Sequence, residues 1–174
     1  MPLHDCPHTF EQLAAEVLPT HMQRMREALA NAESMENFCK SGVGIKTLLK
    51  NKERHKDFSG CYTLIEGNNP IYVGISRGVI GRLKQHVCGK THFDASLAFR
   101  IAMAKHPDQA VKKLTRSEAM QDTMFGTSFY EAQTYLKTLT AAFIEITNPL
   151  ELYVFEAYCA IELDTHQWNS FETH

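Results

Sequence analysis

Apolar residues recur every three to four positions over most of this chain, and strict alternation with polar residues is confined to short stretches. The longer period predicts helices and the shorter one predicts strands. Helices are predicted over residues 10–38, with a break or kink at Pro19, and over 45–56, 78–87, 93–106, 128–139 and 149–163. Strands are predicted over residues 60–66, 71–75 and 141–147. Asn148 and Pro149 suit the N-cap and first position of the last helix.

This order of elements predicts one domain of the α/β or α+β class, with a small, three-stranded, mainly antiparallel sheet flanked by helices. The 174 residues, of which 44% are hydrophobic, suffice for a proper core. No run approaches the roughly 18 apolar residues that cross a bilayer, so we expect no membrane association. The N-terminus has acidic residues and no apolar signal segment, and five scattered cysteines lack a C-x-x-C pair. These features favour free thiols and a cytoplasmic location.

The stretch "GCYTLIEGNNPIYVGIS" reads as a hairpin that gathers two tyrosines. A three-residue loop over 67–69 would set Glu66 opposite Pro70, Leu64 opposite Tyr72 and Tyr62 opposite Gly74. Both tyrosines would then share one face. A mostly apolar set would share the other face and meet the core: Cys61, Thr63, Ile65, Ile71, Val73 and Ile75. A two-residue loop would separate the tyrosines. The alternative interpretation is that these are ordinary strand tyrosines.

The helix after the hairpin carries Arg82 and His86 at positions i and i+4, beside an apolar stripe. A guanidinium and an imidazole one turn apart, next to two phenols, would suit a phosphate. An exposed helix face explains the pair equally well.

One carboxylate interrupts an apolar helix face near the C-terminus. Glu156 shares that face with Leu152, Tyr153 and Cys159, whereas Glu151 and Glu162 should mark the solvent side. An inward carboxylate requires a cation, a metal ion or hydrogen-bond donors, and a buried ion pair with an arginine is the alternative to a metal. Asn169 follows in a polar loop that could fold back over the helix end.

Charge is distributed unevenly although the net charge is only −2. Residues 40–57 contain six basic and two acidic residues, a net +4, and residues 77–116 contain nine basic and two acidic residues, a net +7. The two blocks flank the hairpin, which suits a polyanion, although solvated helix faces have the same composition. A separate metal site in "HDCPH", using His4, Cys6 and His8, is a weaker hypothesis because no second ligand cluster has suitable spacing.

Taken in order, these residues resemble the GIY-YIG nuclease family. The first motif reads Cys61-Tyr62-Thr63, where only the tyrosine matches, and the second reads Tyr72-Val73-Gly74, a close match. The family also has an arginine and a companion histidine on the following helix, and these match Arg82 and His86. Its metal-binding glutamate matches Glu156, and its late asparagine matches Asn169. The resemblance covers residues 58–174, with 89–140 as a helical insertion, and leaves 1–57 as an N-terminal helical extension. Ile75 departs from it, because repair members often carry a lysine there.

The resemblance implies hydrolysis of DNA phosphodiesters with one divalent metal ion, Mg²⁺ or Mn²⁺, held by Glu156. It implies that Arg82 contacts the phosphate, that Tyr62 or His86 takes the proton of the attacking water, and that Tyr72 positions phosphate or water. Asn169 would tie its loop to the site. The basic blocks would bind the DNA backbone, chiefly through Lys50, Lys52, Arg54, Arg77, Lys84 and Lys90. A homodimer would supply two active sites for cutting both strands. The alternative function is a catalytically inactive DNA-binding or protein-interaction module on the same fold.

Overall fold

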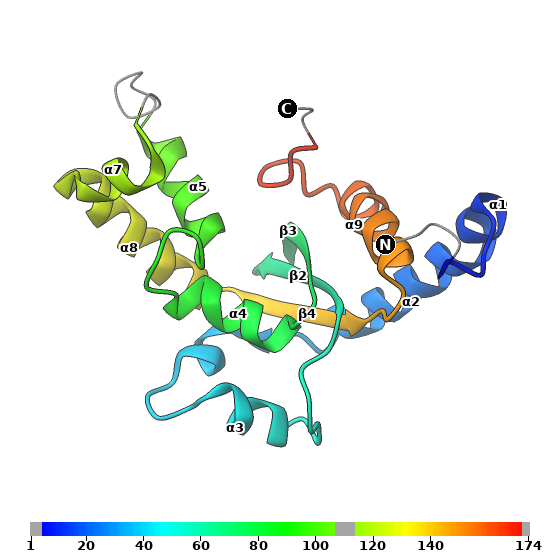
Figure 1. Ribbon diagram of the computed structural model, residues 1–174. Coiled ribbons are helices and arrows are strands. Elements are labelled where there is room, and N and C mark those ends of the chain that lie inside the picture. Colours follow the sequence, from blue (N-terminus) through cyan, green and yellow to red (C-terminus); the bar gives the residue numbers. More distant parts are fainter. Residues whose placement is uncertain (1–4, 107–113, 172–174) are drawn as a thin grey trace.

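The computed structural model describes residues 5–106 and 114–171, which form a fold of mixed helices and strands (Figure 1). This confirms the predicted α+β class. The sheet has four antiparallel strands in the order β1–β4–β2–β3. Their bounds are β1 (Glu33–Ser34), β2 (Gly60–Glu66), β3 (Asn69–Ser76) and β4 (Thr140–Glu145). The prediction of three strands is wrong because the short β1, inside a segment predicted as helix, pairs with the start of β4.

The predicted N-terminal helix ends earlier than expected. It comprises α1 (Phe10–Gln12), a π-helical turn (Leu13–Val17) and α2 (Leu18–Leu29), and a 3-10 helix (Met35–Cys39) follows β1. Pro19 lies in the first turn of α2, where its missing N–H is tolerated, so the irregular turn precedes it. The protein has one hydrophobic core on each face of the sheet. Met22 of α2 packs in one of these cores and Met35 in the other. One straight helix could not reach both cores, and the chain therefore turns after Leu29.

The remaining helices agree in place with the predicted ones, with shifted ends and one exception. They are α3 (Ile45–Lys50), α4 (Val79–Cys88), α5 (Ser96–Lys105), α7 (Arg116–Gln121), α8 (Thr123–Thr138) and α9 (Pro149–Glu162). The exception is α7, which lies in a segment where no helix was predicted. Asn148 caps α9 as predicted, since its Oδ1 accepts hydrogen bonds from the amides of Leu150 and Glu151 at 3.0 and 3.2 Å. Helix α3 is shorter than predicted because Glu53 adopts a left-handed φ of 55° and the Arg54 amide bonds back to the Leu49 carbonyl.

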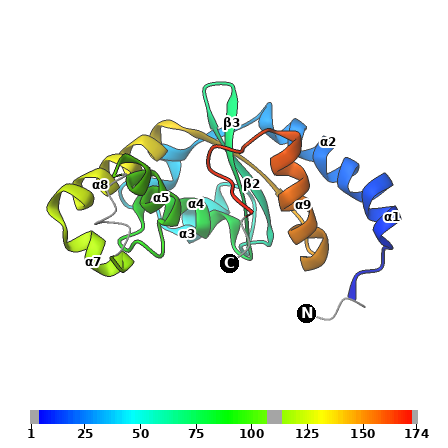
Figure 2. The same ribbon diagram turned by 90° about the horizontal axis from the view of Figure 1, so that it is seen from above.

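Helices cover both faces of the sheet (Figures 1 and 2). Helices α4, α5 and α8 pack on the face that carries Tyr62 and Leu64, whereas α2 and α9 pack on the face that carries Cys61 and Val73. The chain before β2 contributes to both cores, with Phe38 in the first and Met25 in the second. Figure 2 shows the C-terminal segment running between the α5 side and the α9 side of the molecule, over the β2–β3 hairpin.

The β2–β3 hairpin combines a two-residue turn with a register shift. Leu64 pairs with Tyr72 and Tyr62 with Gly74, as predicted. Glu66 pairs with Asn69 instead of Pro70, because the chain turns at Gly67, whose φ is 59°. Between the two registers Ile71 is the extra residue on β3, and it packs in the core of the tyrosine face instead of the opposite face. The bulge lets a short turn coexist with paired tyrosines.

Candidate active site

The two hairpin tyrosines lie side by side on the sheet face that α4 covers. Their ring centroids are 6.1 Å apart. The Tyr62 ring lies over Gly74, where an added Cβ would meet the Tyr62 hydroxyl oxygen at 2.5 Å and the Tyr72 ring at 3.0 Å. Glycine at position 74 is therefore required by the close approach of the two phenols.

Helix α4 is held against the hairpin by a carboxylate from outside the helix. The N-cap residue Gly78 has no capping side chain. Instead, Asp57 accepts hydrogen bonds from the amides of Ile80 at 3.0 Å and Gly81 at 2.8 Å, and the Phe58 carbonyl accepts from Val79. A carboxylate at this end also interacts favourably with the helix dipole. Asp57 thereby fixes the start of the helix that carries Arg82 and His86.

His86 faces the sheet and contacts Tyr62 directly. The Tyr62 hydroxyl lies 2.7 Å from His86 Nε2, and both side chains are buried. Burial, together with a smaller contribution from the nearby Arg82 charge, lowers the pKa of His86 to about 3, so the imidazole is neutral near neutral pH. Its Nδ1 has no hydrogen-bond partner among the described residues.

Burial also dominates the acidity of the phenols. It raises the pKa of Tyr62 well above its usual value, and it raises the pKa of Tyr72. Arg82 acts in the opposite direction on both phenols without outweighing burial. A phenolate that acts as a base would need cationic surroundings strong enough to outweigh burial. In this structure Tyr62 is instead a neutral phenol whose hydrogen-bond partner is a neutral imidazole.

Arg82 extends from the same helix toward the beginning of α5. Its Nη2 donates to Ser96 Oγ at 2.7 Å and its Nη1 donates to the Asp94 carbonyl at 2.8 Å. No carboxylate lies within salt-bridge distance of Arg82 in residues 5–106 and 114–171. The arginine is thus oriented by neutral acceptors, and its charge is left uncompensated by the part of the protein that the structure describes.

Glu156 lies at the rim of the buried face of α9. Leu152, Phe155 and Cys159 form that face, whereas Tyr153, predicted to share it, is exposed. Burial raises the pKa of Glu156, and the carboxylate in turn raises the pKa of Tyr72. Across the described ranges Glu156 has no hydrogen bond or ion pair. The predicted alternative, a buried ion pair with an arginine, is therefore not formed with any described residue.

The prediction that Glu151 marks the solvent side of α9 is wrong. Its side chain is only 12% exposed and lies 3.2 Å from His21 Nε2 and 3.6 Å from His8 Nε2. The N-terminal segment and α2 cover this part of α9, which a helical wheel drawn for α9 alone does not reveal. Glu162, the second predicted surface glutamate, forms an ion pair with Arg26 of α2.

The C-terminal loop is tied to the edge strand by Asn169. Its Oδ1 accepts from the Val73 amide and its Nδ2 donates to the Val73 carbonyl, both at 2.8 Å. The side chain thus pairs with β3 as a neighbouring strand would, at the point of the chain next to Tyr72. The carbonyl of Trp168, in the same loop, accepts a hydrogen bond from Arg100 of α5.

The six predicted DNA-binding cations fall into two groups. Lys50, Arg77 and Lys90 are exposed and form no side-chain hydrogen bond or ion pair with the described residues. The other three have partners within the protein. Lys52 pairs with Glu33, Arg54 pairs with Glu145 at 2.8 Å, and Lys84 donates to the carbonyls of Phe38 and Val43.

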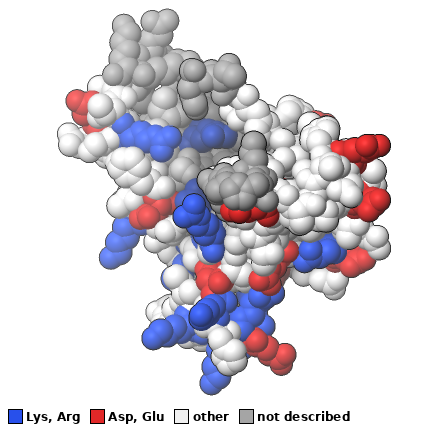
Figure 3. Space-filling model, turned by 45° about the vertical axis from the view of Figure 1, so that its right-hand side comes forward, with Lys and Arg blue, Asp and Glu red and all other residues white. Residues whose placement is uncertain are grey.

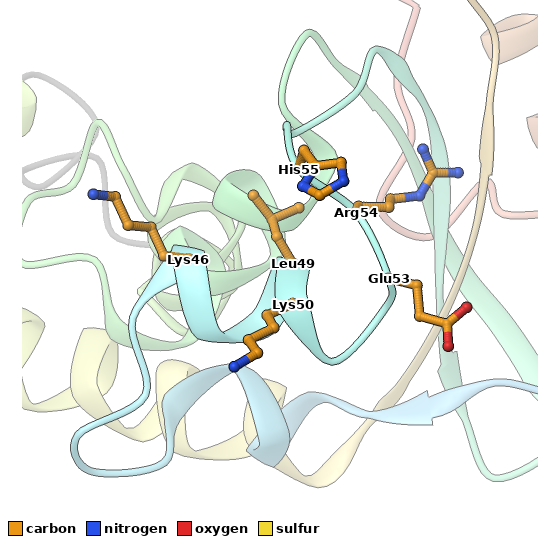
Figure 4. A pocket seen from close by; sticks show the side chains of 6 residues that line it. All are labelled: Lys46, Leu49, Lys50, Glu53, Arg54 and His55. Carbon is orange, nitrogen blue, oxygen red and sulfur yellow. The ribbon is translucent and has the colours of Figure 1, made fainter.

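Lysine and arginine side chains gather around α3 at the lower end of the molecule (Figure 3). A cavity of about 590 Å³ opens there, lined by Lys46, Leu49, Lys50, Glu53, Arg54 and His55. Figure 4 shows that the ends of Lys46, Lys50 and Arg54 point in different directions instead of converging. Diverging cations do not form a small-anion site, but they suit a long polyanion that passes over the surface.

The Glu156 carboxylate is a single oxygen ligand, which suits a hard divalent cation that takes few ligands from the protein. No group of three or more His, Cys, Asp or Glu residues could hold a metal ion within residues 5–106 and 114–171. Mg²⁺ is often bound by one or two carboxylates, with substrate phosphates and water completing the shell, so one half-buried carboxylate is compatible with it. For the "HDCPH" hypothesis, His4 lies outside the described residues, and His8 contacts Glu151.

Sequence reasoning missed Asp57, Ser96 and Trp168 and gave Arg100 no place near the tyrosines. The glycine at the start of α4 signals that its amides need an external acceptor, but it does not identify Asp57. The contacts of Ser96 and Arg100 depend on how α5 packs against α4 and the C-terminal loop, which local pattern does not encode.

Comparisons with family models, curated proteins and solved structures find no significant match for this chain. Within the described residues, no helix is long and apolar enough to cross a membrane.

Proposed function

We propose that this protein is a metal-dependent DNA endonuclease that hydrolyses phosphodiester bonds at the Tyr62–His86 site. The observation that carries the proposal is that Arg82 and Glu156, which both lack a partner of opposite charge among the described residues, lie close enough to Tyr72 to shift its pKa, beside the Tyr62–His86 hydrogen bond. A bound anion would compensate the positive charge of Arg82, and a bound cation would compensate the negative charge of Glu156. A phosphodiester with a bound divalent ion supplies both charges.

In this reaction the scissile phosphate lies between Arg82 and Glu156. Arg82 donates to its non-bridging oxygens and stabilises the charge that develops in the transition state. Its bonds to Ser96 and the Asp94 carbonyl hold the guanidinium in place before substrate binds. Tyr72 donates a hydrogen bond to the phosphate or to the attacking water. Asn169 holds the C-terminal loop on β3 beside Tyr72.

Proton removal from water involves Tyr62 and His86 together. Because both groups are neutral, Tyr62 would accept the water proton on its oxygen while its own proton passes to His86 Nε2, 2.7 Å away. Negative charge gathering on the phosphate favours the imidazolium that results. Glu156 would hold Mg²⁺ or Mn²⁺ with phosphate and water oxygens, and the ion supplies charge compensation for the phosphate and the leaving 3′ oxygen.

Exposed cations would bind the DNA on either side of the site. Lys50, Arg77 and Lys90 are available for phosphate contacts, whereas Lys52, Arg54 and Lys84 would contact DNA only by sharing or leaving their partners. Cutting both strands at one position would require two active sites, supplied by a homodimer or by successive nicks.

The alternative is a non-catalytic DNA-binding or protein-interaction module. The complete burial of Tyr62 and His86 favours it, since a purely structural hydrogen bond would look the same. Incubation with supercoiled plasmid separates the two functions. The endonuclease converts the plasmid to nicked or linear forms with Mg²⁺ and stops with chelator. A plasmid that remains supercoiled over a range of Mg²⁺ and Mn²⁺ concentrations, while still being bound, supports the module.

A further inference from the structure

Helix α5 places two polar side chains on the face that approaches Arg82. Ser96, the first residue of α5, accepts the hydrogen bond from Arg82 Nη2 at 2.7 Å. Arg100 follows Ser96 by four residues, so the two side chains lie one helical turn apart, with Cβ atoms about 5–6 Å from each other. Because Ser96 contacts Arg82, the same face of α5 carries Arg100 alongside the candidate active site.

The surroundings of Arg100 confirm this direction. Its Nη1 donates to the carbonyl of Trp168, in the loop that Asn169 ties to Val73 beside Tyr72. The positive charge of Arg100 also lowers the pKa of Tyr72, as that of Arg82 does. Two guanidinium groups from different helices therefore act on one phenol.

The charge of Arg100 has no partner in the described part of the chain. Its side chain is exposed, and no carboxylate lies within salt-bridge distance of it in residues 5–106 and 114–171. A neutral carbonyl uses one of the five N–H donors of a guanidinium. The remaining donors are free to bind an anion while the bond to Trp168 persists, and planar paired donors suit a phosphate better than they suit a carbonyl.

We propose that Arg100 binds a second DNA backbone phosphate, adjoining the one that Arg82 contacts. The proposal rests on the proposed function, because it assigns a substrate contact next to the same site. It gives the helical insertion a role in substrate binding, since α5 orients Arg82 through Ser96 and contributes Arg100 itself. Consecutive phosphates held by two arginines would fix the strand on both sides of the Tyr72 phenol.

The test pairs single-charge removal on the protein with single-charge removal on the DNA. Affinity is measured with Ca²⁺ in place of Mg²⁺ for short duplexes that carry one neutral methylphosphonate, scanned position by position. We expect the unmodified protein to lose about tenfold in affinity at each contacted phosphate. In Arg82→Gln, the methylphosphonate at the phosphate that Arg82 contacts should no longer lower the affinity. In Arg100→Gln, the same should hold at the phosphate that Arg100 contacts. These two phosphates should be adjacent on one strand. The control Lys105→Gln, on the same helix, should lose affinity at every position where the unmodified protein does.

Persistence of all losses in Arg100→Gln, or their disappearance at a phosphate that does not adjoin the Arg82 position, would overturn the proposal. Failure of the Arg100 proposal can be distinguished from failure of the proposed endonuclease function. Because the Arg82 variant defines the reference phosphate, the adjacency is measured by binding alone. Absence of cleavage in Mg²⁺ would refute the hydrolytic reaction while leaving the Arg100 contact decided by these affinities.

Discussion

The Tyr62 hydroxyl and His86 Nε2 form a 2.7 Å hydrogen bond between β2 and α4 inside the protein core. Both groups are shielded from solvent, and the bond joins the hairpin to the helix that carries Arg82. A buried imidazole with a pKa of about 3 links the stability of the fold to pH. In the unfolded chain a histidine has a pKa near 6.5.

The stability of the protein should therefore fall as the pH is lowered from about 6.5 toward 3. In this window the unfolded chain binds a proton at His86 that the folded protein does not, so the free energy of unfolding rises with pH. The contribution of His86 has a slope of at most about 1.4 kcal/mol per pH unit. To isolate this contribution, the free energy of unfolding is measured with urea as a function of pH for the unmodified protein and for His86→Gln, and the two profiles are subtracted. Parallel profiles would contradict a neutral, buried His86.

Removing the Asp57 carboxylate should destabilise the protein by about 1–3 kcal/mol, because buried amides at the start of α4 would lose their acceptors. Asp57→Asn should cost less, since an amide oxygen can still accept. Chemical unfolding measures both changes, with Glu36→Ala at an exposed position as the matched control. An Asp57→Ala variant as stable as the control would mean that α4 is held by packing alone.

Ser96→Ala should lower turnover about tenfold, with little effect on the KM for DNA, because the Arg82 guanidinium would lose a 2.7 Å bond that orients it. Ser96→Thr keeps the hydroxyl and should restore most of the activity. Steady-state kinetics with labelled duplexes provide both constants. If turnover is unchanged in Ser96→Ala, or if serine and threonine differ as much as serine and alanine, Ser96 does not position Arg82.

The exposed cations should determine how steeply DNA affinity falls with salt. Each phosphate neutralised contributes about 0.9 log units of affinity per log unit of salt. Joint replacement of Lys50, Arg77 and Lys90 by glutamine should reduce the slope, whereas Arg26→Gln, which removes a charge paired with Glu162, should leave it unchanged. Fluorescence titrations over a range of salt concentrations give the slopes. A triple variant that keeps the original slope would show that these side chains only solubilise the surface.

Local pattern predicted the elements that carry the site better than it predicted their environment. Alternation around Tyr62 and Tyr72 placed both phenols on one face, and the Asn148 cap located α9. The pattern failed where distant segments decide the outcome. The turn at Gly67 is shorter than expected because a bulge at Ile71 restores the register. Glu151 is covered by the N-terminal segment, and the burial that raises the pKa of Tyr62 comes from a core to which α4, α5 and α8 all contribute.

Plasmid cleavage by Glu156→Gln tests the proposed reaction most directly. The substitution preserves the size of the side chain and removes the negative charge that a hard cation requires, and Glu162→Gln near the end of the same helix serves as the control. We predict that Glu156→Gln binds DNA with nearly unchanged affinity and does not cleave it in Mg²⁺ or Mn²⁺, whereas the control cleaves normally. Metal-dependent cleavage by Glu156→Gln at the rate of the unmodified protein would contradict the assignment of Glu156 as the metal ligand.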